Sequence, residues 1–174
     1  MQEGKLVYDG FVKVVVIETE LNGQMVEREK LIVHPAVGAL VVDANKRVGL
    51  VRQYRPTIGE YLWEIPAGLV DANALTPLTA LLEELHEECE IKPEEILVIE
   101  REPIEEFYLM DGRSDEVTLI YYIEVTAQTN KVVADADVEE VAWFNRKEIE
   151  AMMAKKVIKD SKTRLALHHF LRAF

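Results

Sequence analysis

The chain has 174 residues, 49% hydrophobic and 30% charged, which is typical of one globular domain or of one domain with a small appendage. Its formal net charge of −12 argues against nucleic acid or an anionic membrane as the main partner. The single cysteine, Cys89, excludes a framework of intrachain disulfides. The first residues show no signal-peptide pattern, and no apolar run reaches the roughly 18 residues of a spanning helix, so we expect a cytoplasmic protein.

The first third of the chain is rich in predicted strands. Residues 11–21 and 25–34 read as two strands, and the sequence Asn-Gly-Gln between them predicts a hairpin turn. Residues 37–54 hold two more strands around a polar turn, and an apolar stretch at 61–70 contains Pro66 and Gly68 and leads into a loop.

A helix is predicted after this loop. Thr76 can cap it, and Pro77 can occupy its first position. Its apolar residues recur at helical spacing and predict one buried face that runs to about Glu90. They are Leu78, Leu81, Leu82, Leu85 and Cys89.

The rest of the chain predicts buried strands at 117–125 and 138–144, then two helices with a break near 159–162. Strands interspersed with a few helices indicate an α+β or mixed α/β fold. We expect residues 1–36 to form a small antiparallel β extension and residues 37–174 to form the main domain.

The predicted helix carries five glutamates between residues 83 and 90. Glutamates at i and i+4 repel each other, and Glu84, Glu87 and Glu88 lie within about a third of the helix circumference. One interpretation is an acidic face in contact with solvent. The other is a site for a hard divalent cation such as Mg²⁺, which prefers carboxylate oxygens and phosphates as ligands. The helix pattern alone leaves both interpretations open.

The residues before the helix favour the second interpretation. The segments "QYRP", "EIPAG" and "GRSDE", followed by "LTALLEELHEE", resemble the Nudix hydrolases and most closely their ADP-ribose pyrophosphatase branch. The resemblance covers roughly residues 6–150. The second half of the Nudix signature is matched after Gly68 by Glu84, Leu85, Glu87, Glu88 and Ile91.

The chain departs from the signature in three places. The loop after Gly68 is one residue longer, and Ala74 or Leu75 stands where the signature has a glutamate. Glu83 replaces the signature arginine, which in the family orients a neighbouring metal-binding glutamate. Glu90 replaces the glycine after the helix, so an easy left-handed helix end is lost.

The resemblance implies an α/β/α sandwich with a mixed sheet and a divalent-metal site. Glu84 and Glu88 would be direct metal ligands, Glu87 would serve a second metal or its water, and the carbonyl of Ala67 would complete the shell. The metal would be Mg²⁺, with Mn²⁺ as a substitute. A general base is expected on the loop before the last strand, at Asp137, with Asp135, Glu139 and Glu140 as alternates.

Substrate contacts are implied at Arg55, at Glu116 near the terminal ribose, and at Arg28 across a dimer interface. The implied function is Mg²⁺-dependent hydrolysis of ADP-ribose or a related nucleoside-diphosphate sugar, giving AMP and ribose 5-phosphate. The implied assembly is a homodimer formed through the N-terminal sheet. Two alternatives stay open: a hydrolase of another nucleoside diphosphate linked to a further group, such as a dinucleotide coenzyme, and a non-catalytic domain that senses a nucleotide.

Overall fold

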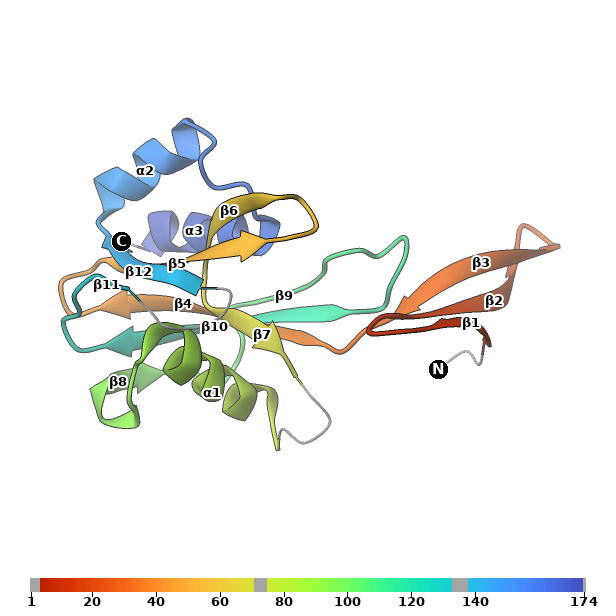
Figure 1. Ribbon diagram of the computed structural model, residues 1–174, viewed down its shortest axis with the longest axis horizontal. Coiled ribbons are helices and arrows are strands. Elements are labelled where there is room, and N and C mark those ends of the chain that lie inside the picture. The colour runs from red at the N-terminus through yellow and green to blue at the C-terminus, as the bar shows by residue number, and fades with distance from the viewer. Residues whose placement is uncertain (1–3, 71–74, 133–137, 174) are drawn as a thin grey trace.

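The computed structural model describes residues 4–70, 75–132 and 138–173, and its strands form two separate sheets (Figure 1). The larger sheet has nine strands and is covered by one helix on one face and by two helices on the other. This arrangement confirms the expected α/β/α sandwich with a mixed sheet. None of the described helices is long and apolar enough to cross a membrane.

The smaller sheet is antiparallel and lies at the N-terminus. Its strands are β1 (Lys5–Asp9), β2 (Lys13–Leu21) and β3 (Gln24–Ile32), in that order across the sheet. The predicted hairpin is present, because Asn22 and Gly23 both adopt positive φ angles of 52° and 79° between β2 and β3. Positive φ at both central positions matches the twist of a two-residue hairpin.

The larger sheet has the strand order β11-β12-β5-β4-β10-β8, with β6 paired to β5, β7 to β4 and β9 to β10. Only β4 and β10 run parallel to each other among these pairs. The strands are β4 (Ala36–Asp43), β5 (Val48–Arg55), β6 (Glu60–Glu64), β7 (Ala67–Leu69), β8 (Ile96–Ile99), β9 (Glu105–Tyr108), β10 (Val117–Val125), β11 (Lys131–Val132) and β12 (Val138–Phe144).

The apolar stretch at 61–70 forms two strands that Pro66 separates, β6 and β7. Proline cannot donate a ladder hydrogen bond, so the chain leaves β5 there and pairs with β4 instead. This crossing brings Ala67 and Gly68 to the middle of the sheet, beside the acidic helix.

That helix is α1 (Pro77–Cys89), and the hydroxyl of Thr76 caps it by accepting the N–H of Thr79 at 3.1 Å. It ends at Glu90, which adopts a left-handed conformation with φ of 52°. The helix end of the signature is therefore kept although a glutamate replaces the glycine. The short 3₁₀ helix η1 (Pro93–Glu95) follows, and the chain closes with α2 (Arg146–Ala154) and α3 (Ser161–Ala173).

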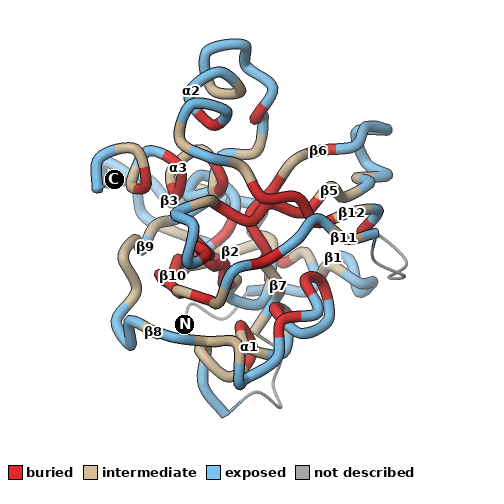
Figure 2. Tube along the Cα trace, turned by 90° about the vertical axis from the view of Figure 1, so that its left-hand side faces the viewer, coloured by how far each residue is buried: buried red, intermediate tan, exposed pale blue. Residues whose placement is uncertain are grey.

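The core consists of two apolar clusters, one on each face of the larger sheet. The predicted face of α1 is confirmed, since Leu81, Leu85 and Cys89 are buried against β4 and β12. Figure 2 shows the buried residues concentrated in the larger sheet. The smaller sheet in contrast leaves apolar side chains exposed, among them Tyr8 and Phe11.

Candidate functional site

The candidate site begins where β7 meets α1. The N–H of Ala67 donates a hydrogen bond to Oε2 of Glu88 at 3.0 Å. A Cβ atom built on Gly68 would lie 1.7 Å from Oε1 of Glu84, so only glycine leaves room for that carboxylate. Glu84 and Glu88, one helical turn apart, thus lie against two consecutive residues of β7. The contact with Glu84 explains why the motif has glycine at position 68.

Glu88 is a buried carboxylate, with 5% of its surface exposed. Burial raises the pKa of Glu88 to about 8, and the negative charge of Glu84 adds to the rise. The Ala67 amide and the charges of Arg55 and Lys162 act in the opposite direction without cancelling it. Within the described part of the chain, Glu88 forms no ion pair with a lysine or arginine. The protein surroundings of Glu88 therefore favour its neutral form at low and neutral pH.

Arg55 does not extend freely into solvent. Its Nε and Nη2 donate to the two carboxylate oxygens of Glu64 at 2.8 and 2.7 Å. Lys162 of α3 binds the same carboxylate, and it also lies 3.2 Å from Asp160. Although burial works in the other direction, these two cations keep the pKa of Glu64 below its usual value.

Sequence reasoning missed Glu64 and Lys162. Glu64 is the acid of "EIPAG", a segment that carries the family resemblance, but the sequence alone assigns no role to its carboxylate. Lys162 carries no local signal, because its partner lies 98 residues earlier in the chain.

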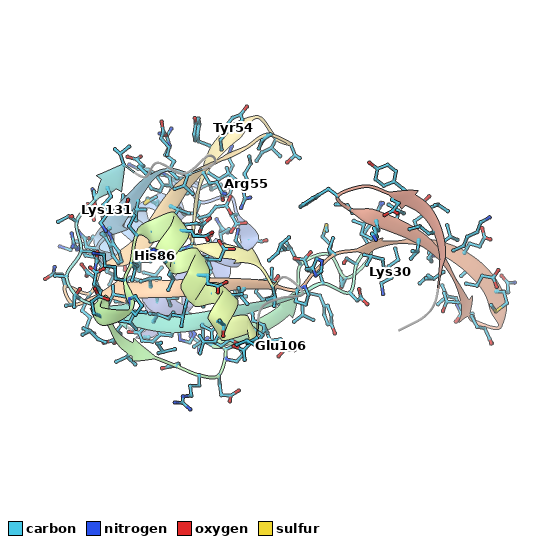
Figure 3. All side chains as sticks on the ribbon, turned by 60° about the horizontal axis from the view of Figure 1, so that its bottom comes forward. Lys30, Tyr54, Arg55, His86, Glu106 and Lys131 are labelled. Atoms are coloured by element: carbon cyan, nitrogen blue, oxygen red, sulfur yellow. The ribbon has the colours of Figure 1, made fainter. Side chains whose placement is uncertain are left out.

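The remaining glutamates of α1 point elsewhere. Glu87 is exposed, as are Glu83 and His86 (Figure 3 labels His86 on α1). No group of three or more acidic, histidine or cysteine side chains converges as a ready metal cage among the described residues. The structure brings Ala67, Glu84 and Glu88 together and leaves Glu87 at the rim. It is the amide of Ala67 that contacts Glu88, and the role of its carbonyl stays a prediction.

Glu116, the predicted ribose contact, lies directly before strand β10. Its exposed fraction is 9%, and burial raises its pKa while the charge of Lys162 opposes the rise. Arg28 by contrast lies exposed on β3, far from α1, and donates to the backbone oxygen of Glu27 (Figure 1). Within one chain, β3 with Arg28 lies far from α1, and the role of Glu116 in the site stays a prediction.

The structure describes only two of the four candidates for the general base. Asp137 and its alternate Asp135 lie outside the described residues. Glu139 and Glu140 lie on β12, where both face Arg52 of β5; Oε1 of Glu140 is 3.9 Å from its guanidinium. The assignment of the base therefore stays a prediction.

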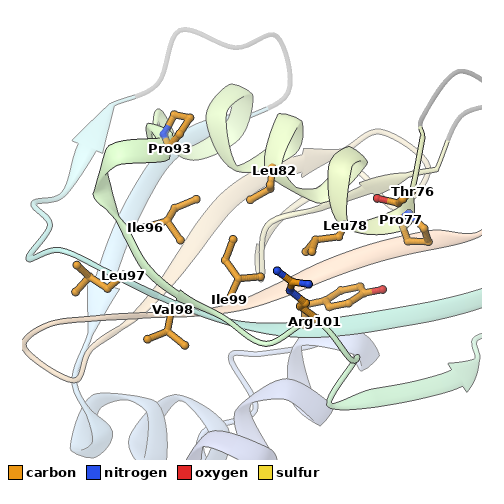
Figure 4. Close-up of a pocket in the computed structure, with 11 residues that line it drawn as sticks. Thr76, Pro77, Leu78, Leu82, Pro93, Ile96, Leu97, Val98, Ile99 and Arg101 are labelled. Atoms are coloured by element: carbon orange, nitrogen blue, oxygen red, sulfur yellow. The ribbon is translucent and has the colours of Figure 1, made fainter.

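A groove of about 830 Å³ lies apart from these carboxylates, between α1 and β8 (Figure 4). Its walls are mainly apolar and include Leu78, Leu82 and Ile99, and none of the predicted site residues lines it. Because no predicted site residue lines this groove, the candidate site is the pair of carboxylates Glu84 and Glu88 against β7.

The chain is similar to several known proteins. It is 40% identical over 67 residues to an ADP-ribose pyrophosphatase of Mycobacterium tuberculosis, a match that covers 38% of the chain and 32% of that protein. It is 31% identical to a methanol dehydrogenase activator of Bacillus methanolicus and 23% identical to an ADP-ribose pyrophosphatase of Bacillus subtilis. Each of these two matches covers 91% of the chain and 84% of the relative. The model of the NUDIX domain matches residues 33–166, which include both carboxylates, and the chain therefore belongs to the Nudix family.

Proposed function

We propose that the protein is a Nudix pyrophosphohydrolase that cleaves ADP-ribose or a related nucleoside-diphosphate sugar with the help of Mg²⁺. The observation that carries the proposal is the buried carboxylate of Glu88, held by the Ala67 amide beside Glu84. A cation would stabilise the charged form of the buried Glu88 carboxylate, beside the half-buried Glu84. Two relatives named ADP-ribose pyrophosphatase support the substrate class.

The residues present fit a divalent cation. Glu84 and Glu88 would hold Mg²⁺, which commonly takes one or two carboxylates and fills its remaining positions with water and substrate phosphate. The metal would neutralise the anionic pyrophosphate and so favour attack by water. Mn²⁺, of similar ligand preference, would substitute for it.

The chain itself supplies orientation and proton transfer. The Ala67 amide fixes the direction of the Glu88 carboxylate, and Gly68 leaves space for Glu84. Arg55 is held in place by Glu64 and contributes positive charge at the edge of the cluster, where an anionic substrate would approach. We propose that Asp137 or Glu140 acts as the general base and accepts a proton from the attacking water. Glu116 would accept a hydrogen bond from a ribose hydroxyl.

We further propose a homodimer that forms through the N-terminal sheet. Tyr8 on β1 is 60% exposed, Phe11 in the connection from β1 to β2 is 96% exposed, and further apolar side chains of this sheet are exposed as well. Exposed apolar surface of this kind is typical of a protein interface. In such a dimer, Arg28 would reach the site of the partner copy.

The test is AMP release from ADP-ribose in the presence of Mg²⁺. The variant Glu84→Gln removes a ligand charge, and Glu83→Gln is the matched control, because Glu83 is exposed on the preceding position of the same helix. We expect release by the wild type and the control and a large loss in Glu84→Gln. If none of the three proteins releases AMP, also from NADH and sugar nucleotides and with Mn²⁺, hydrolysis of this class is refuted.

A second candidate is a domain that binds a nucleotide without cleaving it. Glu83 and Glu90 in place of the signature arginine and glycine favour it, and so does the relative named as an activator of methanol dehydrogenase. Saturable binding of ADP-ribose measured by calorimetry, with no AMP formed over hours, would support this candidate over the hydrolase.

A further inference from the structure

The guanidinium group of Arg55 is held by a carboxylate from the neighbouring strand. Arg55 is the last residue of β5 and Glu64 is the last residue of β6, and the two strands pair antiparallel. Nε and Nη2 of Arg55 donate to the two carboxylate oxygens of Glu64 at 2.8 and 2.7 Å. Two parallel hydrogen bonds of this kind fix the plane of the guanidinium as well as its position.

The strand pairing places this ion pair at positions that face α1. Side chains of a strand alternate between its two faces, so Val51 and Arg55 are on the same face of β5. Val51 is buried in the apolar cluster that contains Leu81 of α1, and Glu64 is directly opposite Val51 in the pairing of β5 with β6. Arg55 and Glu64 therefore belong to the side of the sheet that carries the candidate site.

Glu64 is itself held by the first turn of α3. Its side chain is 2% exposed and binds Lys162, whose side chain is 11% exposed. The next residue is held as well, because the N–H of Ile65 donates to the hydroxyl oxygen of Thr163 at 2.9 Å. Thr163 in turn donates its N–H to Oδ2 of Asp160 at 2.8 Å. Two consecutive residues after the β5–β6 hairpin are thus tied to two consecutive residues of α3.

Part of the Arg55 guanidinium stays available to a ligand. An arginine has five N–H donors, and the contact with Glu64 uses those of Nε and Nη2. In the part of the chain that the structure describes, Nη1 donates no hydrogen bond, and 38% of the side chain is exposed. Arg55 therefore presents charged donors in a fixed orientation, and phosphate oxygens suit such donors.

We propose that Glu64 is a positioning residue, which orients Arg55 so that its free donors meet the diphosphate of the substrate. Lys162 and Thr163 support this arrangement from α3. The proposal rests on the proposed function in one respect, that the ligand is a nucleoside diphosphate. An arginine that is already held loses less conformational freedom when it binds an anion, so Glu64 strengthens binding without contact with the substrate.

The negative charge of Glu64 has the opposite effect, since it offsets the positive charge that attracts an anionic ligand to Arg55. Two substitutions separate the two effects. Glu64→Asp keeps the charge and withdraws the carboxylate by one methylene group, whereas Glu64→Gln keeps the length and removes the charge. Positioning predicts weaker binding by both variants. Charge neutralisation alone predicts no change in Glu64→Asp and tighter binding by Glu64→Gln.

The experiment is a calorimetric titration with the α,β-methylene analogue of ADP-ribose in the presence of Mg²⁺. A methylene group in place of the bridging oxygen prevents hydrolysis, so binding is measured without turnover. We expect both Glu64 variants to bind the analogue about three- to tenfold more weakly than the wild type. Glu60→Asp is the matched control and should bind as the wild type does, because Glu60 lies on the same strand in an exposed ion pair with Lys159.

A double-mutant cycle with Arg55→Met separates positioning from damage to the fold. If Glu64 acts through Arg55, Glu64→Asp causes no further loss of affinity in a protein that already carries Arg55→Met. A purely structural role would weaken binding by the same factor in both backgrounds. Equal losses in the two backgrounds, or a Glu64 variant that binds the analogue as tightly as the wild type, would overturn the proposal.

The positioning role and the hydrolase fail in different ways. AMP release tests the hydrolase, and the ratio of affinities for the analogue tests Glu64. A protein that releases no AMP still supports the role of Glu64 if both variants bind the analogue more weakly. A wild type that does not bind the analogue overturns the role of Glu64, whereas AMP release from NADH would still support a hydrolase.

Discussion

The burial of the Glu88 carboxylate predicts how the free energy of unfolding depends on pH. Its pKa is raised to about 8 in the folded protein from an ordinary value of 4.5, with burial as the main cause. Because the folded pKa is the higher one, the contribution to stability is fully present below about pH 4.5 and is lost as the pH rises to about 8. The variant Glu88→Gln removes the titration and keeps an oxygen that can accept the Ala67 N–H.

The magnitude follows from the two pKa values. Each tenfold change in proton affinity corresponds to about 1.4 kcal/mol, so ionised Glu88 costs the metal-free protein about 3 to 5 kcal/mol above pH 8. Urea unfolding of wild type and Glu88→Gln, in the presence of a chelator and at a series of pH values, measures this difference. The variant should be the more stable protein near pH 9, and its advantage should disappear near pH 4.

Glu83→Gln serves as the control, since it removes an exposed carboxylate from the same helix. Saturating Mg²⁺ should restore much of the wild-type stability near pH 8 and do little for Glu88→Gln, because bound metal replaces the missing positive charge. If the free energies of unfolding of wild type and Glu88→Gln ran parallel across the pH range, the argument from burial would be refuted.

Three further substitutions test neighbouring features. Gly68→Ala places a Cβ 1.7 Å from the Glu84 carboxylate, so AMP release should fall at least tenfold while urea unfolding shows a loss of about 1 to 3 kcal/mol. Gly112→Ala, where a Cβ meets nothing within 4 Å, is its control. Glu90→Gly relieves a left-handed residue and should stabilise the protein by about 0.5 to 1 kcal/mol in urea unfolding, with AMP release unchanged. Glu83→Arg restores the signature residue at an exposed position, so AMP release should change by less than about twofold; a large gain would show that position 83 still serves the site.

Much of the fold could be predicted because its signals are local. The strands β10 and β12 have the predicted bounds, since each is rich in β-branched and aromatic residues. Helix α1 carries its cap, its proline and its apolar face within 14 residues, from Thr76 to Cys89. The strands β8 and β9 were not predicted, because four residues are too few for a period to stand out and their pairing with β10 is a tertiary contact.

The candidate site could likewise be predicted in part. Glu84 and Glu88 were predicted from helical spacing and from the resemblance, and the structure places both against β7. The sequence could not show that Glu88 is buried whereas Glu87 is exposed, because a difference of one helical position decides which carboxylate meets the sheet.

The electrostatics of the acidic helix depend on residues outside it. Five glutamates stand between residues 83 and 90, and each like-charged pair at i and i+4 costs the helix about 0.2 to 0.5 kcal/mol. Arg55 and Lys162 are positive, and both form ion pairs with Glu64. Glu64 is buried, and its charge would destabilise the fold without these two partners. The compensation is incomplete at Glu88, as its raised pKa shows. Glu84 and Glu88 both lie against β7, and the ionised form of the buried Glu88 weakens the metal-free fold, so a cation bound to this pair would stabilise the protein.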